Sequence, residues 1–204
     1  MIAIIDYDAG NVKSVQNALK KLGFEAVITS DIETIENADK VIFPGVGEAS
    51  SAMKKLQERG LDAVIQNLKQ PVLGICLGMQ LMCNASEEGN TKALGIFDCE
   101  VKLFPNSDIV PHMGWNNVSE MKGKLLENIS DTDNFYFVHS YYFAPSDASI
   151  VLGSSDYPES FACVVGRDNV FGFDWRVCKR RIYCSIFYTS IRTDFATTCN
   201  KSVV

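Results

Sequence analysis

The sequence lacks the features that mark several large classes of protein. No apolar run reaches the ~18 residues that a membrane-spanning helix needs, and the N-terminal residues show neither the basic region nor the cleavage pattern of a signal peptide. Basic residues are also in the minority, with 19 Lys and Arg against 25 Asp and Glu. Nucleic acids and anionic membranes are polyanions that need a basic face, so we exclude both as main partners. We expect a cytoplasmic protein.

The cysteines lack the spacing of a metal site or of a disulfide framework. Their number is odd, since the chain has seven, and no two of them form a C-x-x-C pair. We therefore predict mostly reduced thiols, no bound metal and no cofactor. The sequence also has no internal repeat, low-complexity segment or linker before residue 174. With 204 residues, 47% of them hydrophobic, the chain fits one domain better than two.

The first half of the sequence is predicted to form an α/β structure. Four short apolar runs are interpreted as strands, at residues 2–5, 26–29, 40–43 and 72–75. Between them, apolar residues recur at helical spacing within residues 12–22 and again within 53–68. Apolar runs without alternation, separated by amphipathic helices, indicate parallel strands that are covered on both faces. We predict an open, mostly parallel sheet flanked by helices.

The second half of the sequence has a different pattern. From about residue 96, strand candidates follow one another closely and helices are few; the candidates include residues 100–103, 134–139, 150–154 and 161–173. Closely spaced strands favour antiparallel pairing. We predict antiparallel additions to the parallel sheet.

A candidate nucleophile lies where one predicted strand ends. Residues 74–78 (Gly-Ile-Cys-Leu-Gly) have the form G-x-nucleophile-x-G, which closes the strand at 72–75 and opens a helical segment. The sharp turn leaves no room for side chains two residues before and after the nucleophile, which explains Gly74 and Gly78. At a helix N-terminus the positive end of the dipole favours the thiolate, the reactive form of Cys76.

Simpler interpretations of these residues stay open at this point. Cys76 can be a small buried apolar residue between ordinary turn glycines. The Pro-Gly-Val-Gly loop at 44–47, which follows the strand at 40–43, can be a tight turn between a strand and a helix. However, packing does not require glycines on both sides of a strand-end cysteine, and the loop suits donation of backbone N–H groups to an oxyanion. We therefore favour a thiol nucleophile.

Longer motifs connect the chain with a known family. Residues 74–80 (Gly-Ile-Cys-Leu-Gly-Met-Gln) resemble the class I glutamine amidotransferases, which have a flavodoxin-like fold. Further segments resemble the glutaminase subunits of imidazole glycerol phosphate synthases in particular, namely residues 6–11 (Asp-Tyr-Asp-Ala-Gly-Asn), 44–47, 111–116 (Pro-His-Met-Gly-Trp-Asn) and 135–141 (Phe-Tyr-Phe-Val-His-Ser-Tyr). The likeness runs without a gap from residue 1 to about residue 173.

The resemblance implies acyl transfer by covalent catalysis. Cys76 would attack the side-chain amide of glutamine, form a glutamyl thioester and release ammonia, and water would then free glutamate. The backbone N–H groups of Leu77 and, after a rearrangement, of Val46 would stabilise the oxyanion. The residues implied to hold glutamine are Gly47, Gln80, Glu88, Ser140 and Tyr141. For Glu88, whose carboxylate suits the ammonium group of the substrate, a solvated position at a helix end is the alternative.

The resemblance also implies a partner protein. This partner is a cyclase subunit with a (βα)8 barrel, which forms a heterodimer with the glutaminase and receives its ammonia. The cyclase then produces imidazole glycerol phosphate and an aminoimidazole carboxamide ribotide in histidine biosynthesis. His112 and Trp115, in a predicted loop at 111–116, would lie near the face where ammonia leaves. Taken alone, these two residues fit a structural role equally well.

The C-terminal part of the chain departs from the family. In the family, a histidine base and its orienting carboxylate come from a His-Pro-Glu motif after the strand that corresponds to residues 170–173. In this chain Asp174 and Trp175 follow that strand, and no histidine occurs after His139. Residues 174–204 hold six Lys or Arg against two Asp or Glu, so their charge of +4 leaves -10 for residues 1–173. They contain no Leu, Gly, Glu or Pro, a composition that does not look selected for packing on this core.

Several interpretations of this departure are open. We hypothesise a change of reading frame or a cloning artefact near codon 174. Alternatively the tail is genuine and the chain is a glutaminase-like scaffold without activity, or His139 has replaced the missing base. A different thiol hydrolase of the same fold class is a further alternative, against which the segments at 111–116 and 135–141 speak. We predict one glutamine amidotransferase domain over residues 1–204, with an atypical tail that is disordered or frame-shifted.

Overall fold

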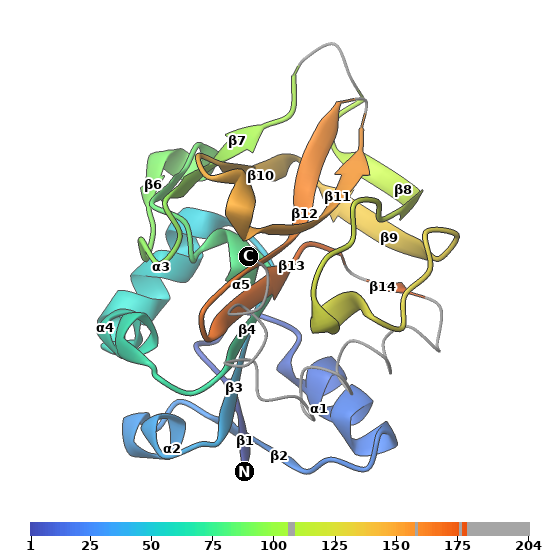
Figure 1. The fold of residues 1–204 in the computed structure, drawn as a ribbon. Helices are drawn as coiled ribbons and strands as arrows, with labels where there is room; N and C mark the ends of the chain where they lie inside the picture. The colour runs from blue at the N-terminus through green and yellow to red at the C-terminus, as the bar shows by residue number, and fades with distance from the viewer. Residues whose placement is uncertain (106–108, 158, 176, 179–204) are drawn as a thin grey trace.

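The computed structural model describes residues 1–105, 109–157, 159–175 and 177–178. Its main feature is an 11-stranded sheet (Figure 1) in which neighbouring strands of the first half are parallel. In spatial order, the parallel strands are β2 (Ala26–Thr29), β1 (Ile2–Ile5), β3 (Lys40–Gly45), β4 (Val72–Cys76) and β13 (Val170–Phe173). Their C-terminal ends meet at one edge of the sheet, which is the edge where open α/β sheets bind ligands.

Beyond β13 the sheet continues with mostly antiparallel pairs. The strands of this part are β5 (Ala85–Ser86), β6 (Thr91–Lys92), β7 (Cys99–Leu103), β10 (Tyr141–Pro145), β11 (Val151–Asp156) and β12 (Ser160–Arg167). A separate sheet of three antiparallel strands contains β8 (His112–Asn117), β9 (Asn134–His139) and β14 (Val177–Cys178). The predicted antiparallel additions are confirmed.

Helices cover both faces of the parallel strands (Figure 1). One face packs against α1 (Val12–Lys21), and the other against α2 (Ile32–Glu36), α3 (Ala49–Glu58) and α4 (Leu61–Asn67). Shorter helical turns are α5 (Leu77–Gln80), η1 (Glu88–Asn90), η2 (Lys124–Leu126) and η3 (Ala148–Ile150). Within the described ranges, no helix combines the length and the apolar character that crossing a bilayer requires.

Side-chain alternation along the strands supplies two hydrophobic cores. In β1, Ala3 and Ile5 belong to the core beneath α2, α3 and α4, whereas Ile2 and Ile4 belong to the core on the side of α1. All four side chains are buried. Because both faces of the strand are covered, both alternating sets must be apolar, and the sequence shows a continuous run. The same reason explains the apolar residues at 41–43 in β3 and those of β4.

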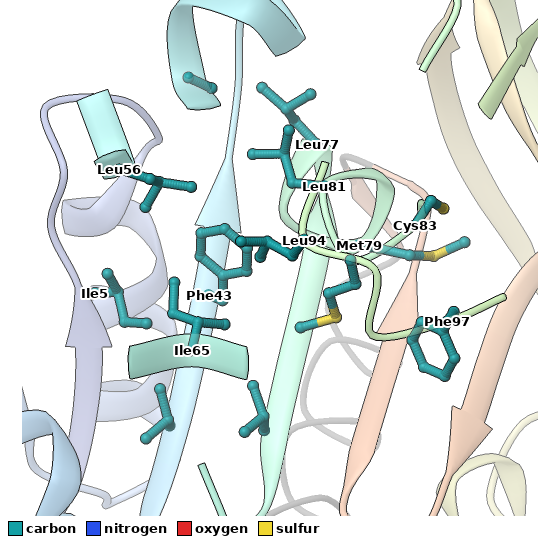
Figure 2. Close-up of a cluster of buried hydrophobic side chains, with 14 of the residues drawn as sticks. Ile5, Phe43, Leu56, Ile65, Leu77, Met79, Leu81, Cys83, Leu94 and Phe97 are labelled. Atoms are coloured by element: carbon teal, nitrogen blue, oxygen red, sulfur yellow. The ribbon is translucent and has the colours of Figure 1, made fainter. Parts of the chain in front are cut away.

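The first core reaches the segment that carries Cys76. Figure 2 shows Ile5 and Phe43 of the sheet beside Leu56 of α3 and Ile65 of α4, with Met79 of α5 in the same cluster. These five side chains are buried. Each such side chain contributes ~1.5–3 kcal/mol relative to an exposed position, so the cluster fixes α5 firmly against the end of the sheet.

The second core contains an aromatic group beneath the three-stranded sheet. The ring of Trp175 lies 4.3 Å from that of Phe135 and 4.8 Å from that of Phe173, measured between centroids. Asp174 and Trp175 are 4% and 1% exposed. These first two residues of the atypical tail therefore pack on the core, which its composition did not lead us to expect. Of the remaining tail, Arg176 and residues 179–204 lie outside the described residues.

Three expected elements differ in the structure. The predicted loop at 111–116 is mostly strand β8, because its polar and glycine residues pair with the apolar β9. The run at 161–173 is divided into β12 and β13 by a turn in which Asp168 has φ 53°. The helical stretch at 53–68 is divided into α3 and α4 at Gly60, whose left-handed φ of 67° ends the first helix.

Candidate active site

Cys76 is held at a strained turn between β4 and α5. Its backbone has φ 51° and ψ -118°, a conformation that residues with a side chain rarely adopt. The sharp strand-to-helix turn that the motif predicts is therefore present at the C-terminal edge of the parallel strands. Helix α5 has only 4 residues, so its dipole acts on the thiol more weakly than that of a longer helix.

Gly74 and Gly78 allow close packing around this turn. A Cβ atom on Gly74 would lie 2.9 Å from the Cα atom of Met79, and one on Gly78 would collide with the carbonyl oxygen of Phe43. Both contacts are closer than a Cβ atom normally approaches another non-bonded atom. Side chains at these two positions would therefore collide with neighbouring atoms, as the sequence analysis inferred. The colliding groups, however, belong to helix α5 and strand β3.

The loop at 44–47 lies directly beside the turn. Gly45 pairs with Cys76 in the register of β3 and β4, and a Cβ atom on Gly45 would lie 2.6 Å from the backbone nitrogen of Gly78. The hydroxyl of Tyr7 donates a hydrogen bond to the carbonyl oxygen of Pro44, with the two oxygens 3.0 Å apart. Burial raises the pKa of Tyr7, so its hydroxyl keeps the donated proton. These contacts hold the loop against the nucleophile.

A pocket of about 280 Å³ opens at this edge of the sheet. Its lining includes all the residues that the sequence nominates for the site: Cys76, Val46, Leu77, Gly47, Gln80, Glu88, Ser140 and Tyr141. The other lining residues are Gly45, Pro111, Val138, His139 and Asp174. The fold thus brings four distant parts of the chain together around one cysteine. The volume is near the lower end for ligand pockets, which suits a small ligand such as an amino acid.

Glu88 lies at the side of the pocket that faces α3. Its carboxylate accepts a hydrogen bond from the backbone N–H of Ala49, with a nitrogen–oxygen distance of 2.8 Å. Burial raises the pKa of Glu88, and the negative charge of Glu48 raises it further. No ion pair of Glu88 is present among the described residues. Glu88 is therefore a half-buried carboxylate facing a pocket, and differs from the solvated acid of the alternative interpretation.

Asp174 is a pocket residue that the sequence analysis missed. It directly follows β13, and its Oδ2 atom lies 3.2 Å from Nε2 of Gln80 and 3.0 Å from Nδ1 of His139. The His139 tautomer with its proton on Nδ1 donates a hydrogen bond to this carboxylate. Its position in the sequence could have indicated this role, because the first residue after a parallel strand lies at the ligand-binding edge of the sheet.

His112 and Trp115 point to opposite sides of β8. His112 is buried, its Nδ1 lies 3.2 Å from Nε2 of His139, and its ring stacks on Tyr157 with 3.7 Å between centroids. Burial, followed by the neighbouring His139, lowers the pKa of His112 to about 4, so the ring is neutral near pH 7. Trp115 is 53% exposed and packs beside Tyr136. The two residues therefore have different surroundings, although they are close in sequence.

The thiol of Cys76 contacts the segment that follows β13. Its Sγ atom lies 3.0 Å from the carbonyl oxygen of Trp175. Both ring nitrogens of His139 are engaged, one by Asp174 and the other by His112. His139 thus lines the same pocket as the thiol and is oriented by a carboxylate. Within the described ranges, no group of His, Cys, Asp and Glu side chains forms a candidate metal site.

Comparison with known proteins agrees with this geometry. The sequence profile described as glutamine amidotransferase class-I matches residues 3–174. The HisH subunit of imidazole glycerol phosphate synthase from Bacteroides fragilis (strain YCH46) is 52% identical over 173 residues, which cover 83% of this chain and 87% of that protein. The HisH 2 subunit from Methanococcus maripaludis is 45% identical over 179 residues, with 84% and 89% covered.

Solved structures show the same fold at much lower sequence identity. A crystal structure titled as a glutamine amidotransferase has a TM-score of 0.72 at 17% identity and covers 93% of this chain and 99% of that chain. The PurLQS structure from Thermotoga maritima has a TM-score of 0.66 at 14% identity, with 93% and 96% covered. The profile match and the relatives extend over most of the sequence, and the chain belongs to the class-I glutamine amidotransferases and, within them, to the HisH subunits of imidazole glycerol phosphate synthase.

Proposed function

We propose that this chain is a glutaminase subunit that hydrolyses glutamine to glutamate and ammonia. The observation that supports this most strongly is the pocket, in which Cys76 at its strained turn shares one cavity with every other nominated residue. Relatives at 52% and 45% identity favour this function over a non-catalytic scaffold and over an unrelated thiol hydrolase.

The first chemical step is attack of the Cys76 sulfur on the side-chain amide carbon of glutamine. A C–S bond forms, the carbonyl oxygen becomes an oxyanion, and the backbone N–H groups of Leu77 and Val46 stabilise it. The C–N bond then breaks, and the nitrogen leaves as ammonia after it has gained the thiol proton. Water attacks the remaining thioester, which releases glutamate and restores the thiol. The close packing of loop 44–47 against the turn supports a role for both N–H groups.

Glu88 holds the ammonium group of the substrate in this proposal. Its carboxylate lines the pocket, and no other charged partner is present among the described residues. Gly47, Gln80, Ser140 and Tyr141 line the same pocket and bind the rest of glutamine. Because Glu88 and Cys76 line the same pocket, this proposal has one glutamine molecule contact both residues.

The thiol proton needs an acceptor, because the chain lacks the His-Pro-Glu motif of the family. The chain has 2 histidines, of which His139 lines the pocket. We propose His139 as the acceptor, with Asp174 as its orienting carboxylate. To reach the thiol, Nε2 of His139 exchanges its contact with His112 for the sulfur or for a bridging water.

The partner in this proposal is a (βα)8-barrel cyclase that receives the ammonia in the cytoplasm. Met113 and Trp115 of β8 are 62% and 53% exposed. Large exposed apolar side chains of this kind mark protein–protein contact surfaces. Their strand carries His112 on its other side, next to the pocket residue His139. Docking at β8 would therefore place the cyclase within a short distance of the ammonia source.

We also propose that a change of reading frame near codon 174 removed the His-Pro-Glu motif, and that His139 and Asp174 act in its place in the chain as it stands. The family profile matches residues 3–174 and therefore ends where the composition of the chain changes. Resequencing the coding DNA around this codon tests the proposal. Codons for His-Pro-Glu in another frame are the expected result, and their absence from all frames would exclude a frame change.

Glutamate release tests the glutaminase function directly. We expect the 204-residue chain, with its cyclase partner and the nucleotide substrate of that partner, to release glutamate from glutamine, and the Cys76→Ala variant to release none. If the two proteins release glutamate equally, Cys76 is not the nucleophile. If neither releases glutamate while the partner still binds, the chain is a scaffold.

A further inference from the structure

The carboxylate of Asp174 lies at the end of the pocket where the reaction takes place. The residue that follows it, Trp175, accepts the contact from the Cys76 thiol at 3.0 Å. Gln80, one helical turn after the nucleophile, contacts Asp174 at 3.2 Å. Glu88, which is proposed to anchor the ammonium group, lies toward α3 and has its own contact with Ala49. The pocket thus has two carboxylates in separate positions, of which the mechanism above uses Asp174 only as a partner of His139.

The contacts of Asp174 determine which atoms face the pocket. Its Oδ2 atom accepts from both Gln80 and His139. Nε2 of Gln80 also lies 3.4 Å from the carbonyl oxygen of Tyr141. Because both observed contacts of the Gln80 amide use its nitrogen, its Oε1 atom remains as the acceptor that can serve a ligand. The wall next to Cys76 therefore presents acceptor oxygens and a negative charge.

An amide and a carboxylate respond in opposite ways to such a wall. The side-chain amide of glutamine has two N–H groups to donate, whereas the side-chain carboxylate of glutamate has only acceptors and carries a charge. Like charges in a partly enclosed pocket repel one another more strongly than in bulk water. A wall with acceptors and a negative charge therefore accommodates the substrate and disfavours the product.

We propose that Asp174 is a specificity-determining residue that makes the reactive end of the pocket select the amide of glutamine over the carboxylate of glutamate. The proposal rests on the glutaminase function, because it assigns glutamine to this pocket. It adds a role in product release: hydrolysis of the thioester creates a carboxylate beside Asp174, and the resulting repulsion speeds the departure of glutamate. Asp174 acts on binding and not on the bonds that form or break.

Binding measurements in the Cys76→Ala background test this proposal without any turnover. Titration calorimetry with glutamine and with glutamate gives two dissociation constants for each protein. Asp174→Asn keeps an oxygen that accepts from His139 and adds an N–H donor in place of the charge. We expect this variant to bind glutamate about tenfold or more tightly than the Asp174 protein does, because removing one close like charge is worth at least ~1.4 kcal/mol. Glutamine binding should change by less than about threefold.

The matched control is Asp168→Asn, which removes the same charge from an exposed turn at the other end of β13. It should change neither dissociation constant. If Asp174→Asn weakens the binding of glutamine and of glutamate to the same extent, while Asp168→Asn leaves both dissociation constants unchanged, Asp174 has a structural role and the proposal is overturned. Failure of the Asp174 protein to bind glutamine at all would instead contradict the glutaminase function.

A second measurement needs no substitution at Asp174. The γ-methyl ester of glutamate has the shape of the product side chain but neither its charge nor an N–H donor. We expect the Cys76→Ala protein to bind glutamine most tightly, the ester less tightly and glutamate least. Equal affinities for the ester and for glutamate would mean that no charge repulsion acts in this pocket, and the proposal would be wrong even if Asp174→Asn fails to fold.

Discussion

The pocket has two walls that the chain builds in different ways. The first, here called the turn wall, consists of Gly45, Val46, Cys76, Leu77 and Gln80, which come from two neighbouring parallel strands and their following segments. The second, the Asp174 wall, consists of His139, Ser140, Tyr141 and Asp174. Its residues come from the three-stranded sheet, the antiparallel part and the end of β13.

The two walls differ in how far apart in the sequence their contacting residues lie. In the turn wall, positions are fixed by the backbone, because glycines allow β3, β4 and α5 to approach closely. In the Asp174 wall, the carboxylate of Asp174 is placed by side-chain hydrogen bonds with His139 and with Gln80 of the turn wall, which lie 35 and 94 positions away in the chain. A local motif can thus specify a nucleophile, while the groups that serve it require the whole fold. Substitutions should therefore disturb the turn wall through stability and the Asp174 wall through kinetics.

The largest expected effect is on the turn wall. Gly78→Ala places a Cβ atom against the carbonyl oxygen of Phe43, and neither backbone can move freely. We expect a loss of about 3 kcal/mol in the free energy of unfolding, as for severe overpacking. Urea denaturation measures this loss. Gly114→Ala is the matched control, since a Cβ atom there meets nothing within 4 Å; equal losses in the two variants would refute the steric argument.

The next effect concerns the proton acceptor in the Asp174 wall. Replacing His139 by Gln removes the imidazole that is proposed to take the thiol proton, and we expect kcat to fall about 100-fold or more. KM should change much less. Steady-state kinetics with glutamine separates the two constants. An unchanged kcat with a raised KM would assign His139 to substrate binding alone.

A smaller effect is expected at the substrate anchor. Glu88→Gln removes the charge that is proposed to bind the ammonium group, and KM for glutamine should rise roughly tenfold with kcat nearly unchanged. Ionised Glu88 is the binding form, and burial raises its pKa. Acidification should therefore weaken glutamine binding at a higher pH than an ordinary glutamate would, and this acid limb should disappear in the variant. A KM profile over pH that is the same in both proteins would contradict the assignment.

The smallest effect is expected at the support of the loop 44–47. Tyr7→Phe removes the hydroxyl that donates to Pro44, while the ring remains packed against Phe43. We expect a stability loss of about 1 kcal/mol, the usual net value of one buried hydrogen bond. A lower urea midpoint with an unchanged m-value would show it. No change in the midpoint would mean that the loop is held by backbone packing alone.

The parts of the fold that the sequence predicts best are those with a local cause. The strand at 2–5 is predicted at its observed bounds because burial on both faces makes every residue apolar. Strand β8 was missed because its polar residues and Gly114 give no strand pattern, and only pairing with β9 makes it a strand. The turn at Asp168 had a signal, since Asp tolerates a positive φ, but the apolar residues on both sides concealed it.

In the site, too, the sequence predicts the features with a local cause better than those that depend on distant contacts. The motif around Cys76 and the family resemblance nominated the residues that the pocket gathers. Asp174 was taken as the start of a foreign tail, and its contacts with Gln80 and His139 depend on segments that fold next to it from far away in the sequence. The opposite orientation of His112 and Trp115 was also hidden until the loop at 111–116 proved to be a strand.

The most direct test of the central claim is detection of the covalent intermediate. The chain with its cyclase partner is mixed with glutamine, quenched in acid during turnover, digested and analysed by mass spectrometry. The account predicts a glutamyl adduct on the peptide that contains Cys76, and no adduct in the Cys76→Ala variant. Steady glutamate production without an adduct on this peptide, or with an adduct on another cysteine, would contradict the assignment of Cys76 as the nucleophile.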